Sequence, residues 1–228
     1  MSLLPVFLKL KGRRCLVVGA GTVAEAKVRS LLKGGADVRV VGPKATQTLR
    51  QWAREGKLVW HVRSFVPSDL EGMFLVVVAT SSRWLNERVY QEAARRRVLC
   101  NVVDDPARCD FYYGAVVRRG PLQIAISTTG CSPALAQRLK GELEKQFGPE
   151  YGARVEQLGK TRRRLFARTM DPKRRQRLLH HLASGEGYPA FVRSKAGKRG
   201  AESVSGTLKK RQRPRGLSPE TNGYTSRR

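Results

Sequence analysis

A glycine-rich run between a buried strand and a helix constrains this chain more than any other feature. The run is Val17-Val-Gly-Ala-Gly-Thr-Val-Ala24, which has the spacing G-x-G-x-x-A. Gly19 permits a tight turn, and Gly21 lets the backbone approach a pyrophosphate at the positive end of the helix that begins near Thr22 and Val23. The run therefore predicts dinucleotide binding, and a glycine turn without a ligand is the alternative reading.

Short apolar strands alternate with helix-like stretches over the N-terminal half of the chain. We expect strands at 15–18, 38–41, 57–62, 73–79 and 98–103, and helices at 23–33, 46–55 and 84–97. This alternation is typical of β-α-β units, which build a parallel sheet. It predicts an α/β fold with a Rossmann-like parallel sheet over residues 1–113.

The second expected strand lacks the acidic residue that ordinarily binds the adenosine ribose of a dinucleotide. It ends Val40-Val-Gly-Pro43-Lys44, without a carboxylate. Ribose contacts must then come from the backbone near Pro43 or from another side chain. Lys44 could favour a 2′-phosphate, but an exposed lysine after a strand is more often simply solvated.

Polar side chains gather where the last expected strand of the sheet ends, in Asn101-Val-Val-Asp104-Asp105-Pro106. Ligands of open α/β sheets bind at the carboxyl edge of the strands, so a carboxylate here can act as a general base beside a nicotinamide. Aspartates before a proline also cap backbone N–H groups in turns. Spacing alone does not decide between these readings.

The pattern changes after Tyr113. Residues 115–120 and 122–126 predict two strands around a Gly120-Pro121 turn, and Ser132-Pro133 opens a helix that we expect to end near Phe147. We expect this small α+β region, 114–147, to pair with a second copy of the chain. Basic helices are expected within 148–192, and 193–228 is too poor in large apolar residues to predict an ordered core.

The charge balance restricts the class of protein. There are 45 Lys+Arg against 18 Asp+Glu, a formal charge of +27, and the excess is concentrated toward the C-terminus. No apolar run approaches the roughly 20 residues of a membrane-spanning helix, and the N-terminal residues lack a secretory leader pattern, so we expect a cytoplasmic protein without membrane contact. A basic RNA-binding arm is an alternative reading of the last third, but its scarce aromatic residues make nucleic-acid binding the weaker one.

Metal and disulfide chemistry have little support in the sequence. The cysteines, Cys15, Cys100, Cys109 and Cys131, form no C-x-x-C pair, and the three histidines are not part of any recognisable motif. We expect small buried thiols and no dedicated metal site.

Several motifs in one order give the chain a specific resemblance. They are Leu4-Pro-Val-Phe-Leu8, Leu16-Val-Val-Gly-Ala-Gly21, Val40-Val-Gly-Pro43, Ala79-Thr80, Leu85-Asn86, Asn101-Val-Val-Asp-Asp-Pro106, Ala115-Val-Val-Arg-Arg-Gly120 and Ile124-Ala-Ile-Ser-Thr-Thr-Gly-Cys-Ser-Pro-Ala-Leu-Ala136. This set resembles the precorrin-2 dehydrogenase family, which includes the dehydrogenase and ferrochelatase part of siroheme synthase. The resemblance covers residues 2–170.

The resemblance implies NAD-dependent oxidation of precorrin-2 to sirohydrochlorin by a homodimer, with Asp104 as the catalytic residue. Whether ferrous iron is then inserted as a second substrate stays open. The cofactor-binding residues it implies, together with those of the glycine run, are Gly19, Gly21, Thr22, Val23, Pro43, Lys44 and Thr80. Candidate groups for the polycarboxylate substrate are Asn101, Arg118, Arg119, Thr128 and Ser132.

Two positions depart from the pattern of the family. Gly114 stands where a proline is usual, and Thr129-Gly130 stands where the family usually has two glycines. A nucleotide-sensing module without catalysis is the main alternative function. Such a module normally keeps the ribose carboxylate, and it has no need for the motifs at 101–106 and 124–136.

Overall fold

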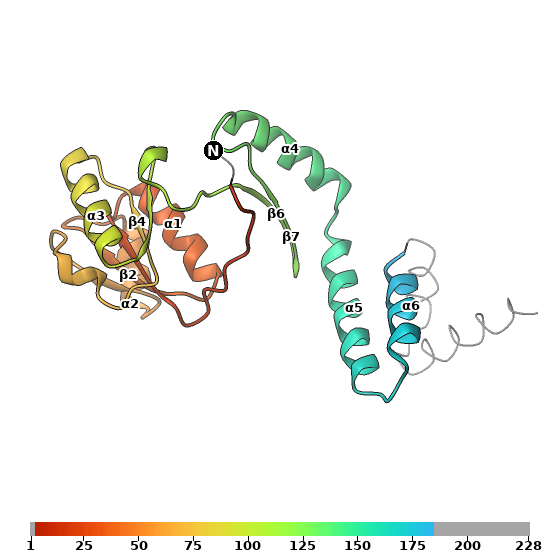
Figure 1. Cartoon of the computed structure of the whole chain (residues 1–228). Helices are drawn as coiled ribbons and strands as arrows, with labels where there is room; N and C mark the ends of the chain where they lie inside the picture. Colours follow the sequence, from red (N-terminus) through yellow and green to blue (C-terminus); the bar gives the residue numbers. More distant parts are fainter. Residues whose placement is uncertain (1–2, 185–228) are drawn as a thin grey trace, which may run out of the picture. The chain divides into compact units, whose positions relative to one another are not determined.

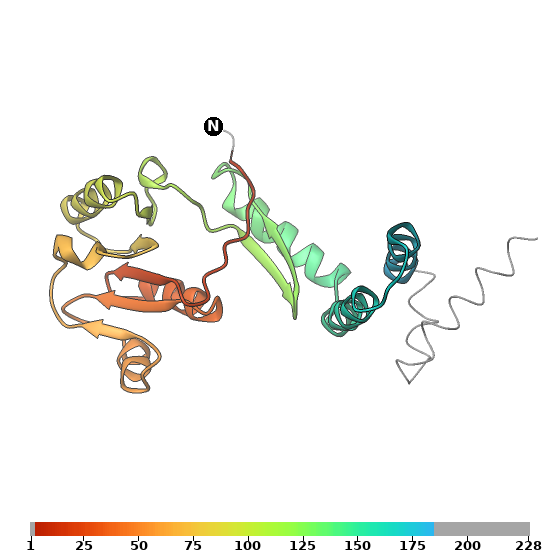
Figure 2. The ribbon, with the colours of Figure 1, turned by 60° about the horizontal axis from the view of Figure 1, so that its bottom comes forward.

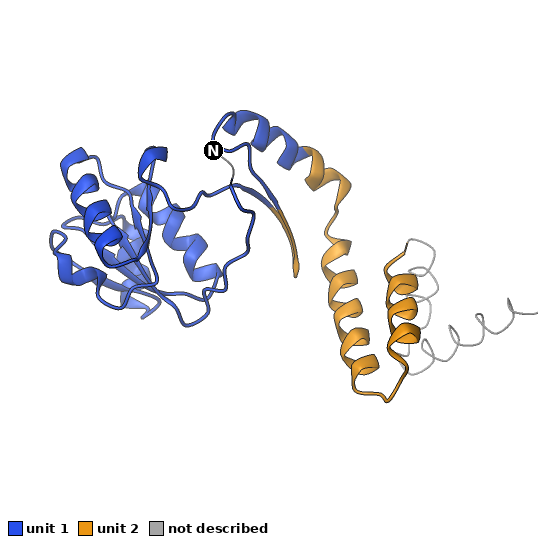
Figure 3. Ribbon diagram, viewed as in Figure 1, with its two compact units in different colours: residues 1–116, 125–141 blue, residues 117–124, 142–228 orange. Residues whose placement is uncertain are grey.

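The computed structural model describes residues 3–184, which form two compact units (Figure 3). Of the described residues, unit 1 comprises 3–116 and 125–141, and unit 2 comprises 117–124 and 142–184. Residues 114–147, expected as one dimerisation region, thus contribute to both units. The predicted tail, 193–228, lies outside the described residues.

A parallel sheet of five strands forms the centre of unit 1 (Figure 2). The strands are β1 Arg14–Val18, β2 Asp37–Val41, β3 Val59–His61, β4 Leu75–Val78 and β5 Leu99–Val102. Their order in the sheet is β3-β2-β1-β4-β5, and every neighbouring pair is parallel. The chain adds β2 and β3 on one side of β1, and then β4 and β5 on the other side. The order of the strands therefore reverses between β1 and β4, which is where doubly wound folds bind ligands.

Helices cover both faces of this sheet (Figure 1). They are α1 Thr22–Lys33, α2 Gln47–Arg54 and α3 Arg83–Arg95, with short 3₁₀ helices η1 Pro67–Leu70 and η2 Pro106–Arg108. Because successive strand residues point to opposite faces, Cys15 and Val17 of β1 pack in the core under α1 and α2, while Leu16 and Val18 pack in the core under α3. The predicted Rossmann-like α/β fold is confirmed.

The chain between β3 and β4 departs from regular alternation. Sequence reasoning expected no element there, and the structure places η1 at this point instead of a full crossover helix. Pro67 occupies its first turn, and Leu70 is fully buried in the core on the α3 side. Phe65 and Met73, on either side of η1, are buried in the same core, so three apolar side chains anchor this short crossover.

The predicted hairpin is present as β6 Ala115–Arg119 and β7 Leu122–Ile126, with Gly120 in a left-handed conformation at φ 55°. Helix α4 follows at Pro133–Gln146. The Ser132 hydroxyl accepts a hydrogen bond from the Leu135 N–H at 3.2 Å, and Pro133 opens the first turn. These two residues start the helix as the sequence predicts.

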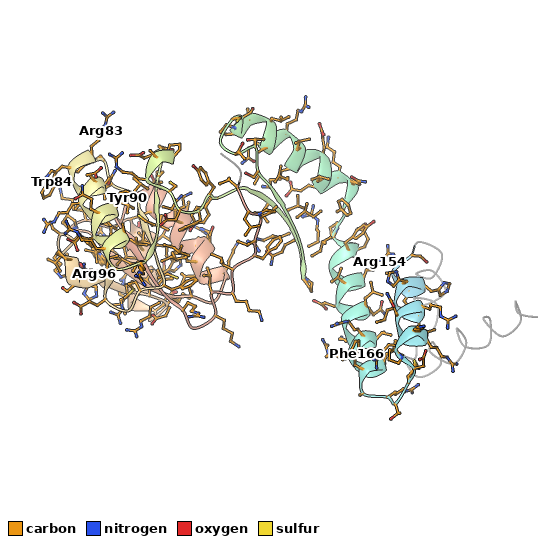
Figure 4. The ribbon with its side chains drawn as sticks, in the orientation of Figure 1. Arg83, Trp84, Tyr90, Arg96, Arg154 and Phe166 are labelled. Carbon is orange, nitrogen blue, oxygen red and sulfur yellow. The ribbon has the colours of Figure 1, made fainter. Side chains whose placement is uncertain are left out.

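Two basic helices lie side by side in unit 2, α5 Glu150–Phe166 and α6 Pro172–Ala183. The Asp171 carboxylate accepts a hydrogen bond from the Arg174 N–H at 2.8 Å and so caps α6. Phe166, labelled in Figure 4, is contacted by the guanidinium groups of Arg162 and Arg175 at 4.8 and 4.3 Å from its ring centre. Among residues 3–184, no helix has the length and apolar character needed to cross a membrane.

Candidate functional site

Gly19 lies at the turn between β1 and α1, where two strand ends come close together. Its φ is +102°, and a Cβ added there would stand 2.2 Å from the carbonyl oxygen of Ala79 and 3.3 Å from a methyl carbon of Thr80. Its N–H donates a hydrogen bond to the carbonyl of Val41 at 2.8 Å. Only glycine fits this backbone, so Gly19 sets the shape of the turn.

Gly21 is the N-cap of α1 and has a different surrounding. A Cβ added there would meet no protein atom within 4 Å, and the residue supplies no side chain to cap the helix. Thr22 and Val23 follow at the exposed first turn, whose N–H groups have no partner within the helix. Open space in front of free N–H groups at a helix N-terminus is what a pyrophosphate requires, so these residues fit the predicted dinucleotide.

The other predicted cofactor residues lie at the same edge of the sheet. Pro43 and Lys44 follow β2 and are exposed. Thr80 follows β4, and its hydroxyl donates to the Asn86 side-chain oxygen at 2.6 Å, which closes the turn into α3. The structure therefore brings Thr80 beside the glycine turn, while its hydroxyl already has a structural partner.

A pocket of about 340 Å³ opens at the carboxyl end of β5, entirely within unit 1. Asn101, Asp104 and Thr128 line it, so three predicted site residues meet there. Ser132, another predicted substrate residue, does not line the pocket, but its N–H donates to the Thr128 hydroxyl at 3.1 Å. Two segments that are distant in sequence, 101–115 and 126–137, form most of its wall.

The backbone at Asp104 has a left-handed conformation, with φ 61°. Such a conformation is uncommon for residues other than glycine, and it is best tolerated by Asp and Asn. The side chain is exposed, and within residues 3–184 its carboxylate has neither a hydrogen bond nor an ion pair. The carboxylate of Asp104 can therefore accept a proton or a hydrogen bond from a ligand.

Asp105 lines the same pocket but is engaged differently. Its carboxylate accepts a hydrogen bond from Arg108 at 2.6 Å, and Arg108 also pairs with Glu87. These two contacts raise the pKa of Arg108 further, since each carboxylate favours its charged form. The two aspartates are thus distinguished by their partners and not by strand alternation, because β5 has already ended at Val102.

Asn101 is buried, and it holds the loop that carries both aspartates. Its side-chain nitrogen donates to the carbonyl of Phe111 at 2.8 Å and to the sulfur of Cys109 at 3.3 Å. Nearby, the N–H of Cys100 donates to the Asp110 carboxylate at 2.8 Å, and the N–H of Asp110 donates back to the Cys100 carbonyl. The segment 109–111 therefore returns alongside β5, and substrate contact by Asn101 stays a prediction.

Arg118 and Arg119 belong to unit 2. The Arg119 guanidinium donates to the carbonyl oxygens of Phe147 at 2.8 Å and Glu144 at 3.0 Å, so it satisfies the C-terminal end of α4. Arg118 is exposed. The structure gives Arg119 a role that sequence reasoning did not foresee, and substrate binding by either arginine stays a prediction.

Lys27 is a pocket residue that sequence reasoning missed. Its ammonium lies 4.1 Å from the centre of the Tyr113 ring. Burial lowers the pKa of Lys27, and the charges of Asp104 and Cys109 act in the opposite direction. A signal was present in the sequence, because Lys27 stands three residues after Ala24 and four before Leu31, both of which are buried on the inward face of α1.

Within residues 3–184, the structure gathers no group of three or more His, Cys, Asp or Glu side chains suited to a metal ion. Burial raises the pKa of the Cys15 thiol to about 11 and that of Cys100 to about 12. Both are neutral core residues.

Two family models match the chain. One, described as "Putative NAD(P)-binding", covers residues 6–115, and the other, described as sirohaem biosynthesis protein central, covers residues 119–146. The first spans the sheet and the glycine turn, and it confirms the prediction of a nicotinamide dinucleotide cofactor. The second spans most of the hairpin and α4.

Relatives with related names match most of this chain. Siroheme synthase of Nitrosococcus oceani is 40% identical over 178 residues, which cover 73% of this chain and 38% of that protein. Siroheme synthase of Photobacterium profundum is 44% identical over 166 residues, covering 72% and 35%. The chain thus spans little more than a third of these relatives.

A solved structure matches the fold at nearly full length. SirC, precorrin-2 dehydrogenase, superposes with a TM-score of 0.73 at 26% identity, covering 91% of this chain and 100% of that one. The two family models, the siroheme synthases and SirC agree with the motifs in sequence order. The chain belongs to the family of precorrin-2 dehydrogenases and the corresponding part of siroheme synthase.

Proposed function

We propose that this protein oxidises precorrin-2 to sirohydrochlorin in siroheme biosynthesis, with NAD as the hydride acceptor. The observation that carries this proposal is the Asp104 carboxylate, which faces a pocket at the same sheet edge as the glycine turn. Within residues 3–184 this carboxylate has neither a hydrogen bond nor an ion pair, whereas that of Asp105 is bound by Arg108. A dinucleotide turn and a free carboxylate at one edge are the two parts that a dehydrogenase of this kind needs.

Cofactor binding and proton transfer are carried out by different residues in this reaction. NAD supplies the hydride acceptor when it is bound. The open space at Gly21 and the first turn of α1 receive its pyrophosphate, with contacts from Pro43, Lys44 and Thr80 at the same edge. Asp104 takes the proton that leaves the macrocycle, so that one hydride and one proton are removed together.

The proposal includes the rest of the expected assembly. Asn101, Thr128 and Ser132, with Arg118 and Arg119, bind the substrate, and the active form is a cytoplasmic homodimer. The hairpin supports dimerisation, because an isolated two-stranded sheet is marginally stable and, among residues 3–184, no third strand pairs with either of its edges. Sedimentation of the full chain is expected to give a dimer at micromolar concentration, and a monomer would contradict this part.

The test is turnover by the purified full chain with precorrin-2 and NAD, followed by NADH formation and by the absorbance of sirohydrochlorin. Both signals should rise together. Ferrous iron added afterwards shows whether siroheme also forms, which decides the chelatase activity separately. A chain that binds NAD but forms no NADH from precorrin-2 would instead be a nucleotide-sensing module.

A further inference from the structure

The pocket at the end of β5 contains a positive charge from the neighbouring helix. Among the described residues that line it, Lys27 is the only lysine or arginine. It extends from α1, whose N-terminus carries the glycine turn. One helix therefore contributes both the cofactor-binding turn and a cation beside the candidate base.

The surroundings of Lys27 leave its charge incompletely compensated. Its ammonium contacts the face of the Tyr113 ring at 4.1 Å, and no carboxylate oxygen of residues 3–184 lies within ion-pair distance. Lys27 is half-buried in the wall of the pocket, so its ammonium has lost part of its water, and this burial lowers its pKa. A cation that is partly removed from water and held against an aromatic ring is ready to bind an anion.

The charges around the pocket determine how an anionic ligand could bind there. Asp104 and Asp105 both line it, and a carboxylate-rich ligand would be repelled by these two groups alone. Arg108 already compensates Asp105. Lys27 is then the group that can offset Asp104 and attract a further carboxylate.

We propose that Lys27 binds a carboxylate of the tetrapyrrole and so orients a polycarboxylated ring against Asp104. This inference rests on the proposed function, since it assigns the substrate of that reaction a binding partner. The Tyr113 ring holds the ammonium in place. The ligand class is a macrocycle with several carboxylates, and its neutral esters should bind poorly.

The test compares Lys27→Met with Lys33→Met in the full chain. Lys33 is exposed in the last turn of the same helix, so both variants lose one positive charge and only one of them loses it from the pocket. Lys27→Met should raise KM for precorrin-2 about tenfold or more, since hydrogen bonds to charged groups are strong. Lys33→Met should leave KM unchanged, and both variants should keep the NAD affinity of the wild type.

Binding of sirohydrochlorin, followed by its absorbance, measures the same contact without turnover. Lys27→Met should weaken it by a similar factor, and Lys27→Arg should recover part of the loss. Thermal unfolding should show that Lys27→Met is at least as stable as wild type, because it removes a partly buried charge. If Lys27→Met does not fold, Lys27→Gln provides the same comparison.

Three results would overturn this inference. Equal KM and equal sirohydrochlorin affinity in the Lys27 and Lys33 variants would show that the pocket charge does not select the ligand. A lower kcat with a shifted pH profile at unchanged KM would show that Lys27 acts on the protonation of Asp104. A wild-type chain that does not oxidise precorrin-2 would remove the proposed function, and this inference with it.

Discussion

A Cβ on Gly19 would stand 2.2 Å from the carbonyl oxygen of Ala79, so the end of β1 approaches the end of β4 too closely for any side chain. Gly21, two residues later, faces open space. The two glycines of one motif therefore have separate tasks. Gly19 is needed for the fold, and Gly21 is needed for the ligand.

Gly21→Val should abolish measurable NAD binding while the thermal unfolding temperature stays close to that of wild type. The new side chain meets no protein atom at its Cβ but fills the space in which we place the pyrophosphate. Titration calorimetry with NAD measures the loss. The matched variant is Gly19→Ala, which should lower stability strongly, and unchanged NAD affinity in Gly21→Val would contradict the assignment.

Asp104→Asn should lower turnover by a factor of about 10²–10⁴, the usual contribution of a general base, with little change in NAD affinity. The amide keeps the size of the side chain but cannot take the proton. Asp105→Asn is the control, because it changes the same atoms in a residue whose partner is Arg108. Rates of NADH formation compare the two variants. An equal or larger loss in Asp105→Asn would show that Asp104 is not the general base.

Thr129→Gly should raise the free energy of unfolding by about 0.5–1 kcal/mol. Thr129 has φ 52°, a conformation that costs a residue with a side chain about 1–2 kcal/mol. Glycine removes this cost, but its greater conformational entropy in the unfolded state offsets part of the gain. Thr129→Ala removes the hydroxyl and keeps the unfavourable backbone. Urea unfolding should therefore place Thr129→Gly above wild type and Thr129→Ala no higher, and the reverse order would show that the loop is not strained.

Thr46→Ala should cost about 1 kcal/mol at neutral pH, the usual value of a helix N-cap. The Thr46 hydroxyl accepts from the Leu49 N–H at 3.2 Å and donates to the Glu25 carboxylate at 2.8 Å, so it joins the start of α2 to α1. Thr46→Ser keeps both bonds and should be close to wild type. Denaturant unfolding of the three proteins checks the order.

The cost of Thr46→Ala should also shrink in acid. The hydrogen bond from Thr46, with a smaller contribution from Arg29, holds the pKa of the Glu25 carboxyl below its usual range. A lowered pKa in the folded state adds stability above the unfolded pKa, and that stability is lost as pH falls through the folded value. A cost that is the same near neutral pH and at about pH 3 would show that the Glu25 contact contributes nothing.

The fold of unit 1 could be predicted because its determinants are local. Buried strands alternate with helical stretches, and a glycine run marks the first turn, so each element follows from its own residues. The structure shortens the expected strand 57–62 to Val59–His61 and the strand 73–79 to Leu75–Val78. Pairing with neighbouring strands decides these ends, and a single segment does not contain that information.

The site was only partly predictable for the same reason. Asp104 follows a strand and belongs to a motif, so its position could be inferred. Arg119 depends on contacts with Glu144 and Phe147, which lie 25 and 28 positions later in the sequence. Lys27 depends on a contact with Tyr113, which lies 86 positions later. An exposed arginine, an arginine that caps a distant helix and a lysine in a pocket look alike in a sequence.

The return of residues 109–111 along β5 has a consequence for how the chain behaves in a crowded solution. β5 is the last strand of the sheet, and the exposed edge of such a strand is a template onto which another chain can add and aggregate. The bridge between Asn101 and Cys109, with the Asp110 contacts to Cys100, occupies part of that edge. The loop that carries the candidate base therefore also blocks part of the edge on which another chain could add. Substitutions made there to alter catalysis can for this reason lower the solubility of the protein.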